Sequence, residues 1–278
     1  MINPIVFKLG TLEIRAFTAS VLVSTAVGVV LLMFSARTRH ESLLRWIDTA
    51  FGALIGGIIG ARAFHVALEW AYFSLHTAQI TALANGGLDW HGAIVGGVIG
   101  AAIVSRLRGV SFADFADTIG VTFPIGVIAI WLACSVAAAG YGAEVRTLAD
   151  FPAWLVTESP DVYGQIAPRL DLPKLGALIG GVLFVLMLAL TAIRRVRQEL
   201  RGLLFWIGLA LFSFSMAIVD VFRGDFVASW FGHRADQVLD LAMLAFAVLM
   251  ICATIAVFRL IRVRRPALDD TALRSASL

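Results

Sequence analysis

Three ionisable residues lie within or at the ends of long apolar segments, where a charge is costly and usually has a function. Arg62 lies in GARAFHVALEW, and His91 lies in DWHGAIVGG, two residues after Asp89. Arg223 lies in AIVDVFRGD, three residues after Asp220. An arginine binds phosphate through two parallel hydrogen bonds, and a histidine can accept a proton near neutral pH. These residue types predict a site for a phosphate or a phospholipid headgroup, with His91 as a general base.

The same residues allow a simpler interpretation. Arginines near the ends of membrane spans extend their guanidinium groups to the headgroup layer, and His91 can cap the helix that it opens. Patterns typical of other chemistry, such as G-x-S-x-G, H-E-x-x-H or a P-loop, are absent from the sequence. His65 and Glu69 lie one turn apart without further ligands, so we expect no metal site and no cofactor.

The composition predicts that these residues belong to a membrane protein. Of 278 residues, 60% are hydrophobic and 15% are charged, and the mean hydropathy is +0.90. A soluble domain has about half apolar and about a quarter charged residues, so the chain has too few charges to cover a soluble surface. Because each span must satisfy its own backbone polar groups, the expected fold class is all-α, a polytopic membrane bundle.

The apolar residues form about seven runs, most of them near the roughly 20 residues that cross a bilayer core. They cover residues 16–36, 48–71, 90–105, 115–139, 175–193, 202–222 and 237–258. The third run is short and rich in glycine. Glycines recur at four-residue spacing in the second and third runs, which predicts that these helices pack closely against neighbouring helices.

The basic residues predict the orientation. Apart from Arg62, the segments on one side of the spans carry 14 Lys and Arg residues, and those on the other side carry seven. The richer side faces the cytoplasm, which places the N-terminus outside and the C-terminus inside. Arg62, His91 and Arg223 then all fall at the outer interface, and this shared depth favours one common site. The net charge of +3 thus reflects membrane topology, and we expect no nucleic-acid partner.

The chain is expected to form one membrane domain over residues 1–265. Residues 140–174, which contain four prolines, are expected to form an external loop or small cap. Residues 266–278 are expected to form a disordered cytoplasmic tail. Residues 1–15 lack an apolar core and are not expected to be a signal peptide.

Several segments resemble the prolipoprotein diacylglyceryl transferase family over nearly the whole chain. The family's His-Gly-Gly element resembles HGAIVGGVIG from His91, and its Gly-x-Arg segment is similar to GARAFHV around Arg62. Its Ile-Glu-Phe-x-Arg segment resembles AIVDVFRGD, with Asp220 in the acidic place. Its first span resembles IRAFTASVL at 14–22, and its last resembles HRADQVLDL at 233–241.

The chain departs from the family at several polar positions. The Arg, two Asn and Glu of the family signature fall on Trp131, Cys134, Ala137 and Ala139, while Gly142 is kept. The family's Tyr in span one falls on Phe17, its Gln-Leu-Tyr-Glu element falls on residues 174–177, KLGA, and an essential Arg falls on Met216. Methionine cannot replace the bidentate phosphate contact of an arginine.

The resemblance implies a transfer of diacylglyceryl from phosphatidylglycerol to the thiol of a lipobox cysteine in the bacterial plasma membrane. The partners would be phosphatidylglycerol and a prolipoprotein signal peptide. His91 would be the catalytic base, Arg62 and Arg223 would hold the phosphate beside Asp220, and Lys174 would supply part of the missing charge. The lost polar residues leave a second hypothesis open, a non-catalytic relative that binds phospholipid or a membrane partner.

Overall fold

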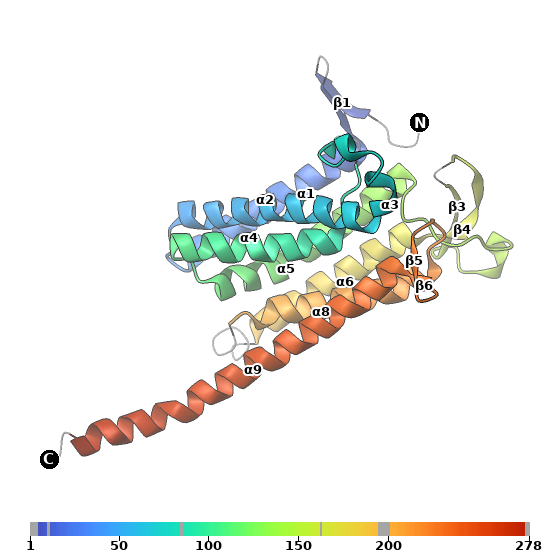
Figure 1. Cartoon of the computed structure of the whole chain (residues 1–278). Coiled ribbons are helices and arrows are strands. Elements are labelled where there is room, and N and C mark those ends of the chain that lie inside the picture. The colour runs from blue at the N-terminus through green and yellow to red at the C-terminus, as the bar shows by residue number, and fades with distance from the viewer. Residues whose placement is uncertain (1–4, 10–11, 84–85, 162, 194–200, 276–278) are drawn as a thin grey trace.

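A computed structural model describes residues 5–9, 12–83, 86–161, 163–193 and 201–275. Seven of its helices are long and apolar enough to cross a membrane, and each overlaps one of the runs predicted from the sequence. They are α1 (Ala16–Thr38), α2 (Leu43–Leu68), α4 (Trp90–Arg108), α5 (Phe112–Ala137), α6 (Leu172–Ala192), α8 (Leu203–Val219) and α9 (Ala235–Ser275), shown in Figure 1. The prediction of an all-α, polytopic membrane bundle is confirmed.

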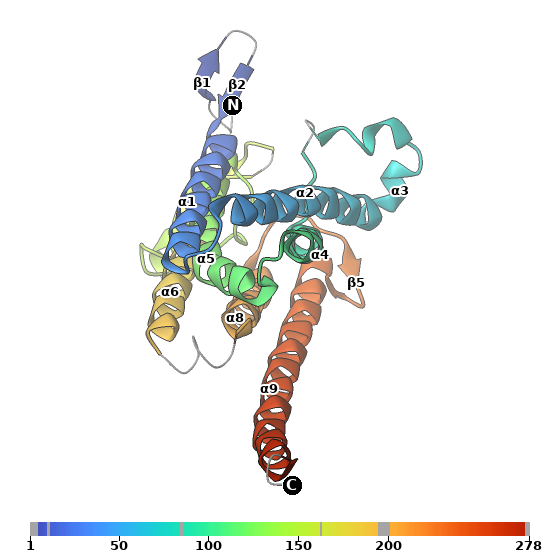
Figure 2. The ribbon, with the colours of Figure 1, turned by 90° about the vertical axis from the view of Figure 1, so that its left-hand side faces the viewer.

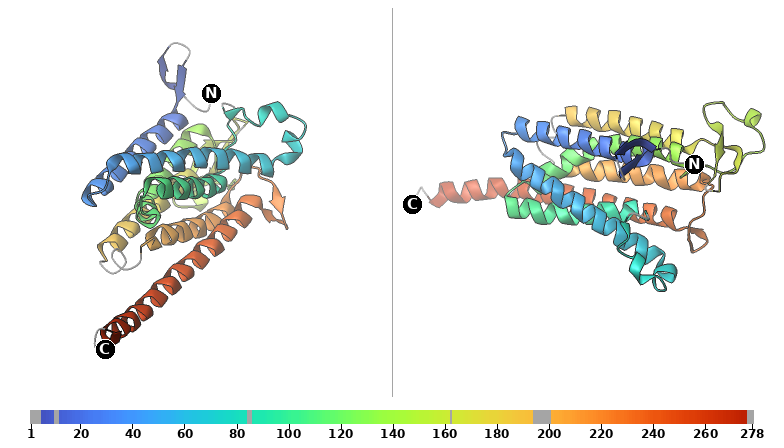
Figure 3. Two further views of the ribbon diagram at one scale, coloured as in Figure 1. Left: turned by 60° about the vertical axis from the view of Figure 1, so that its left-hand side comes forward. Right: turned by 90° about the horizontal axis from the view of Figure 1, so that it is seen from above.

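Short strands and helices lie at one end of this bundle. Three two-stranded antiparallel hairpins are β1 (Ile5–Leu9) with β2 (Leu12–Arg15), β3 (Val156–Pro160) with β4 (Ile166–Leu170), and β5 (Ser229–Trp230) with β6 (His233–Arg234). Short helices are α3 (Trp70–Phe73), η1 (Thr77–Gln79), η3 (Leu148–Asp150) and η4 (Asp220–Phe222). The hairpins and the loop with α3 gather at one end, and the C-terminal end of α9 lies at the other, as Figures 1 and 3 show.

Glycines bring α2 and α4 into close contact, and their spacing predicted such close packing. A Cβ atom added at Gly60 would collide with the carbonyl oxygen of Gly92, and one added at Gly96 would collide with that of Gly56. Figure 2 shows α2 crossing against α4, which is seen nearly end-on. The backbone N–H of Asp89 also donates to the carbonyl of Ala61 at 3.1 Å. These contacts fix the first turn of α4, and therefore His91, against α2.

Aspartates cap the helices that follow the loops, because a carboxylate can accept the unpaired N–H groups of a first turn. Asp89 accepts from the backbone N–H groups of His91 and Gly92 at the start of α4. Asp117 accepts from the N–H groups of residues 202, 204 and 205, so that a side chain of α5 caps α8. This cap holds α8 beside α5 at the end opposite to the hairpins.

Helix α9 is continuous to Ser275. No break in the helix marks the expected boundary at residue 265. The division into a membrane domain, 1–265, and a tail, 266–278, stays a prediction, and residues 276–278 lie outside the described part of the chain.

Candidate functional site

His91 lies in the first turn of α4, and its side chain is almost completely buried. Its Nδ1 atom lies 3.1 Å from Oδ1 of Asp89, and its Nε2 atom lies 3.1 Å from Oδ1 of Asp240 on α9. The ring stacks against Trp90, with 3.8 Å between the ring centroids. The imidazole ring of His91 is therefore held at both nitrogens by carboxyl groups and on one face by Trp90.

The two carboxyl groups constrain the protonation of this ring. An ionised carboxylate only accepts hydrogen bonds, and a neutral imidazole carries one N–H. With Asp89 and Asp240 both ionised, both contacts are hydrogen bonds only if His91 carries two protons. To act as a base, His91 must first release one of these nitrogens from its carboxylate.

Asp89 lies just before α4, outside the membrane-spanning helix. Burial opposes its ionisation, but the hydrogen bonds from the ring and the backbone of His91 outweigh that effect, and the pKa of Asp89 is lowered. The site therefore keeps a negative charge on Asp89 at neutral pH.

Asp220 joins this group through Asp240. The carboxyl groups of Asp220 and Asp240 are both buried and interact electrostatically with each other. Among the described residues, no donor reaches the Oδ2 atom of either carboxyl group. Two carboxyl groups can bond to each other only through a proton, so one shared proton would satisfy this pair.

Arg223 extends the network to the loop that follows η4. Its guanidinium lies 3.2 Å from Asp220, 2.9 Å from Asp236 and 2.5 Å from Asp225. Arg234 binds Asp225 and Asp236 as well, at 3.2 and 3.1 Å. Burial opposes the charge of Arg223, but the carboxylates, Asp225 first, outweigh it and raise the pKa of Arg223 above its ordinary value. Arg223 is therefore a permanent cation that already has anionic partners.

Arg62 has a different environment from the one expected. Its guanidinium donates hydrogen bonds of 2.6 to 2.9 Å to the backbone carbonyls of Gln79, Ile80, Gly86 and Gly87. Its Cζ atom also lies 5.0 Å from the ring centroid of Phe73. In this conformation Arg62 closes the loop between α3 and α4, and its donors bind that loop rather than a cavity shared with Arg223.

Lys174 lies in the first turn of α6, and its side chain is exposed. Its ammonium group pairs with Asp171 at 2.5 Å, and Asp171 also caps α6 through the backbone N–H of Lys174. Of the five residues singled out in the sequence, the structure thus joins His91, Asp220 and Arg223 in one network. Arg62 and Lys174 are each bound locally.

Asp240 was not singled out in the sequence, although it links His91 to Asp220. It lies in HRADQVLDL, the segment that resembles the family's last span. An acidic residue three positions inside the predicted span 237–258 is a signal that could have found it, because such residues are costly there. Its partner was hidden because His91 lies 149 residues away in the chain.

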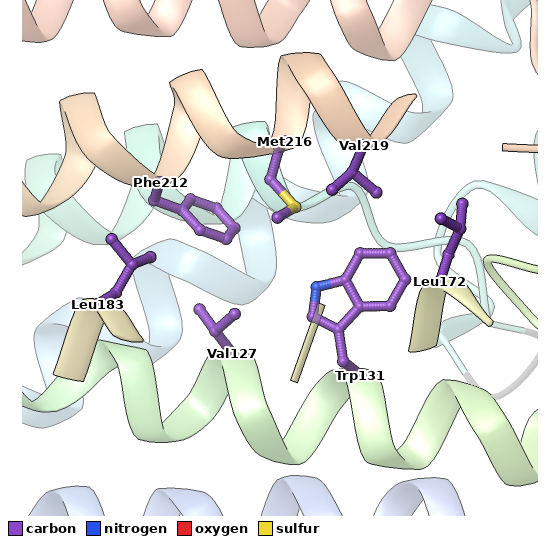
Figure 4. Packing of buried hydrophobic residues seen from close by; sticks show 7 residues of the cluster. All are labelled: Val127, Trp131, Leu172, Leu183, Phe212, Met216 and Val219. Carbon is purple, nitrogen blue, oxygen red and sulfur yellow. The ribbon is translucent and has the colours of Figure 1, made fainter. Parts of the chain in front are cut away.

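Apolar side chains fill the space between α5, α6 and α8. Figure 4 shows this apolar cluster, whose buried members are Val127, Trp131, Leu172, Leu183, Phe212, Met216 and Val219. A Cβ atom added at Gly176 would collide with the indole of Trp131. Two positions at which the resemblance places arginines, 131 and 216, thus belong to a packed core rather than to an ion-binding site.

Two further cavities lie outside the network of His91. An apolar groove of about 460 Å³ lies between α1, α2 and α5, and its lining includes neither His91 nor Arg223. A more polar cavity of about 230 Å³ lies between the end of α5 and the β3–β4 hairpin, where Cys134 and Ala139 line it. In the described part of the chain, no group of three or more His, Cys, Asp or Glu side chains is arranged so that it could hold a metal ion.

Comparison with known proteins shows which family the chain resembles. The family model described as prolipoprotein diacylglyceryl transferase matches residues 4–253. A phosphatidylglycerol–prolipoprotein diacylglyceryl transferase of Bacillus velezensis is 26% identical over 257 residues, which cover 90% of this chain and 91% of that protein. Proteins with the same name are 33% identical over 130 residues in Acaryochloris marina, covering 45% of each chain, and 34% identical over 120 residues in Streptococcus agalactiae, covering 42% of this chain and 46% of that protein.

Proposed function

The chain belongs to the prolipoprotein diacylglyceryl transferase family, and we propose that it transfers diacylglyceryl from phosphatidylglycerol to the lipobox cysteine of a prolipoprotein. One observation carries this proposal: at the hairpin end of the bundle, Asp240 on α9 links His91 on α4 to Asp220 of η4, which pairs with Arg223. A base and a permanent cation held near each other are what this transfer requires.

The roles follow from the chemistry of each group. His91 takes the proton of the attacking thiol, and Arg223 stabilises the negative charge on the departing glycerol phosphate. Asp220, Asp225 and Asp236 orient the guanidinium until the phosphate competes for it. Because the phosphate must displace carboxylates from Arg223, the cost of breaking those ion pairs offsets part of the binding energy of the phosphate. Lys174 on the neighbouring helix α6 supplies further positive charge for the phosphate.

Arg62 contributes to this proposal in two ways. At rest it holds the loop that precedes α4, and so positions His91 indirectly. When that loop opens, the four carbonyls release the guanidinium and it can bind a phosphate oxygen pair. The substrate partners are phosphatidylglycerol and the signal peptide of a prolipoprotein, and the site faces the outer side of a bacterial plasma membrane.

A second function is favoured by the apolar cluster around Trp131. That cluster leaves no charged group at positions 131 and 216, where the resemblance places arginines. A relative without these charges would bind anionic phospholipid at Arg223 but would not stabilise the departing phosphate enough for transfer.

Complementation of a transferase-depleted bacterium separates the two functions. The wild-type chain should restore growth and lipoprotein lipidation, and His91→Gln should not, because glutamine cannot take up a proton. An Asp48→Asn variant, altered on α2 at an ion pair with Arg108, is the control. If the wild type fails to complement but the purified protein binds phosphatidylglycerol in preference to phosphatidylcholine, the second function replaces the first.

A further inference from the structure

The environment of His91 assigns different tasks to its two carboxylate neighbours. We propose that Asp240 is a positioning residue that keeps a proton on Nε2 of His91, so that Nδ1 is the nitrogen that accepts the substrate proton. This proposal rests on the proposed transferase function.

The two carboxylates that contact His91 differ in how deeply they are buried. The side chain of Asp240 is 1% exposed, whereas that of Asp89 is 16% exposed. Asp240 lies in the membrane helix α9, and Asp89 lies in the loop before α4. A partly exposed carboxylate in a loop can turn away from the ring when a substrate arrives, whereas a fully buried one on a packed helix has little room to move.

The helix that carries Asp240 is fastened close to this residue. Gln237 donates from Nε2 to the carbonyl of Ala217 on α8 at 3.2 Å, and the N–H of Ala235 donates to the carbonyl of Ala228 at 2.8 Å. Trp90 covers one face of the imidazole. The distance from Nε2 to Asp240 is therefore fixed by the scaffold, as the orienting contact of a catalytic base must be.

The second carboxyl of the pair sets the charge that His91 meets. One proton shared by Asp220 and Asp240 leaves this pair with one negative charge. The other charged groups of the network are Asp89 before α4, Arg234 on β6, Asp236 on α9, and Arg223 and Asp225 after η4. Arg223 is shared among Asp220, Asp225 and Asp236, so part of the negative charge of the Asp220–Asp240 pair remains for His91, which lies 3.1 Å from Asp240.

The transfer begins with the release of Nδ1. Asp89 withdraws from Nδ1, and the ring loses its second proton to water. The thiol then gives its proton to Nδ1 while the sulfur bonds to the glycerol carbon of the lipid. The bond from that carbon to the phosphate oxygen breaks, and its electron pair leaves on the glycerol phosphate. Throughout, Nε2 keeps its proton on Asp240, which stabilises the imidazolium that forms.

Nitrogen-15 spectra of the histidine rings in the intact protein test the assignment without any substrate. In the wild type, Nε2 of His91 should carry a proton. In Asp240→Asn the amide of the new side chain can donate to Nε2, so the proton should move to Nδ1, opposite Asp89. Asp240→Glu keeps an acceptor and should keep the proton on Nε2. Asp89→Asn, the matched change on the other nitrogen, should also leave Nε2 protonated.

Transfer kinetics give the second readout. Asp240→Asn should lower kcat by about 100-fold or more, the usual contribution of a general base, with KM for phosphatidylglycerol unchanged. Asp240→Glu should recover part of kcat, and Asp48→Asn should behave as the wild type. A proton that stays on Nε2 in Asp240→Asn, or an unchanged kcat, would overturn the proposal. If the wild type transfers nothing, the proposed function fails by itself, and the nitrogen spectra alone decide whether Asp240 holds the proton.

Discussion

Trp131 and Gly176 explain how a polar position became part of a core. The resemblance places an arginine at 131 and a tyrosine at 176, and here the large ring of Trp131 lies where a side chain at 176 would stand. The sequence shows that the arginine and the tyrosine of the family are missing at 131 and 176, because residue types alone decide that. It could not predict that the two changes compensate each other, because the contact joins α5 and α6 across 45 positions of sequence.

This compensation predicts a coupled pair of mutations. Gly176→Ala should destabilise the protein, because the added Cβ collides with the indole, and it should be nearly neutral when Trp131 is replaced by alanine. The coupling free energy should be about 1–3 kcal/mol, which is usual for overpacking and for residues in contact. Reversible unfolding of the single and double variants in detergent measures it. Additive effects of the two substitutions would contradict the packing, and Leu132→Ala, on the exposed side of α5, is the control.

At the scale of elements, hydropathy predicted the seven spans because a run of apolar residues has no other solvent than lipid. The three hairpins were not predicted, since strands of two to five residues have too short a pattern to stand out. The loop between α3 and α4 was also not predicted as a bound structure. Its backbone carbonyls accept hydrogen bonds from Arg62. Every residue has a backbone carbonyl, so the amino-acid sequence does not show which of them bind an arginine.

Arg62 should therefore control the order of this loop. Arg62→Lys keeps the charge but loses the planar fork that reaches four carbonyls. Chymotrypsin should cut this loop after Leu75 or Leu83 about tenfold faster or more, because hydrogen bonds to charged groups contribute about 1.5–3 kcal/mol each. Mass spectrometry identifies the cut. Arg106→Lys, an exposed change near the other end of α4, should leave the rate unchanged; equal rates in all three proteins would show that Arg62 does not hold the loop.

At the scale of the whole molecule, the hairpin end and the end of α9 lie on opposite sides of the bundle, as Figure 3 shows. The basic residues predict that the hairpin end faces outward, and an enzyme that meets secreted prolipoproteins needs its site on that side. The common depth of His91 and Arg223 was predictable from span boundaries. Their connection through Asp240 required the packing of α9 against α4, which no single segment specifies.

Reporter fusions test this orientation. A reporter that is active only outside the membrane should be active when inserted within residues 150–165 and inactive when fused after Arg265, because 14 basic residues oppose seven. A second reporter that is active only in the cytoplasm should give the reverse pattern. Activity of the first reporter after Arg265 would invert the topology and place the network of His91 on the cytoplasmic side.

If this membrane protein is a transferase whose base is His91, the reaction can be measured directly. Purified protein is incubated in phosphatidylglycerol vesicles with a lipobox peptide, and mass spectrometry measures the mass that the peptide gains. The wild type should add diacylglyceryl to the cysteine thiol and release glycerol phosphate, while His91→Gln should bind the same vesicles and transfer at least about 100-fold more slowly. Equal transfer by His91→Gln, or no transfer by a folded wild type that binds the vesicles, would contradict the account.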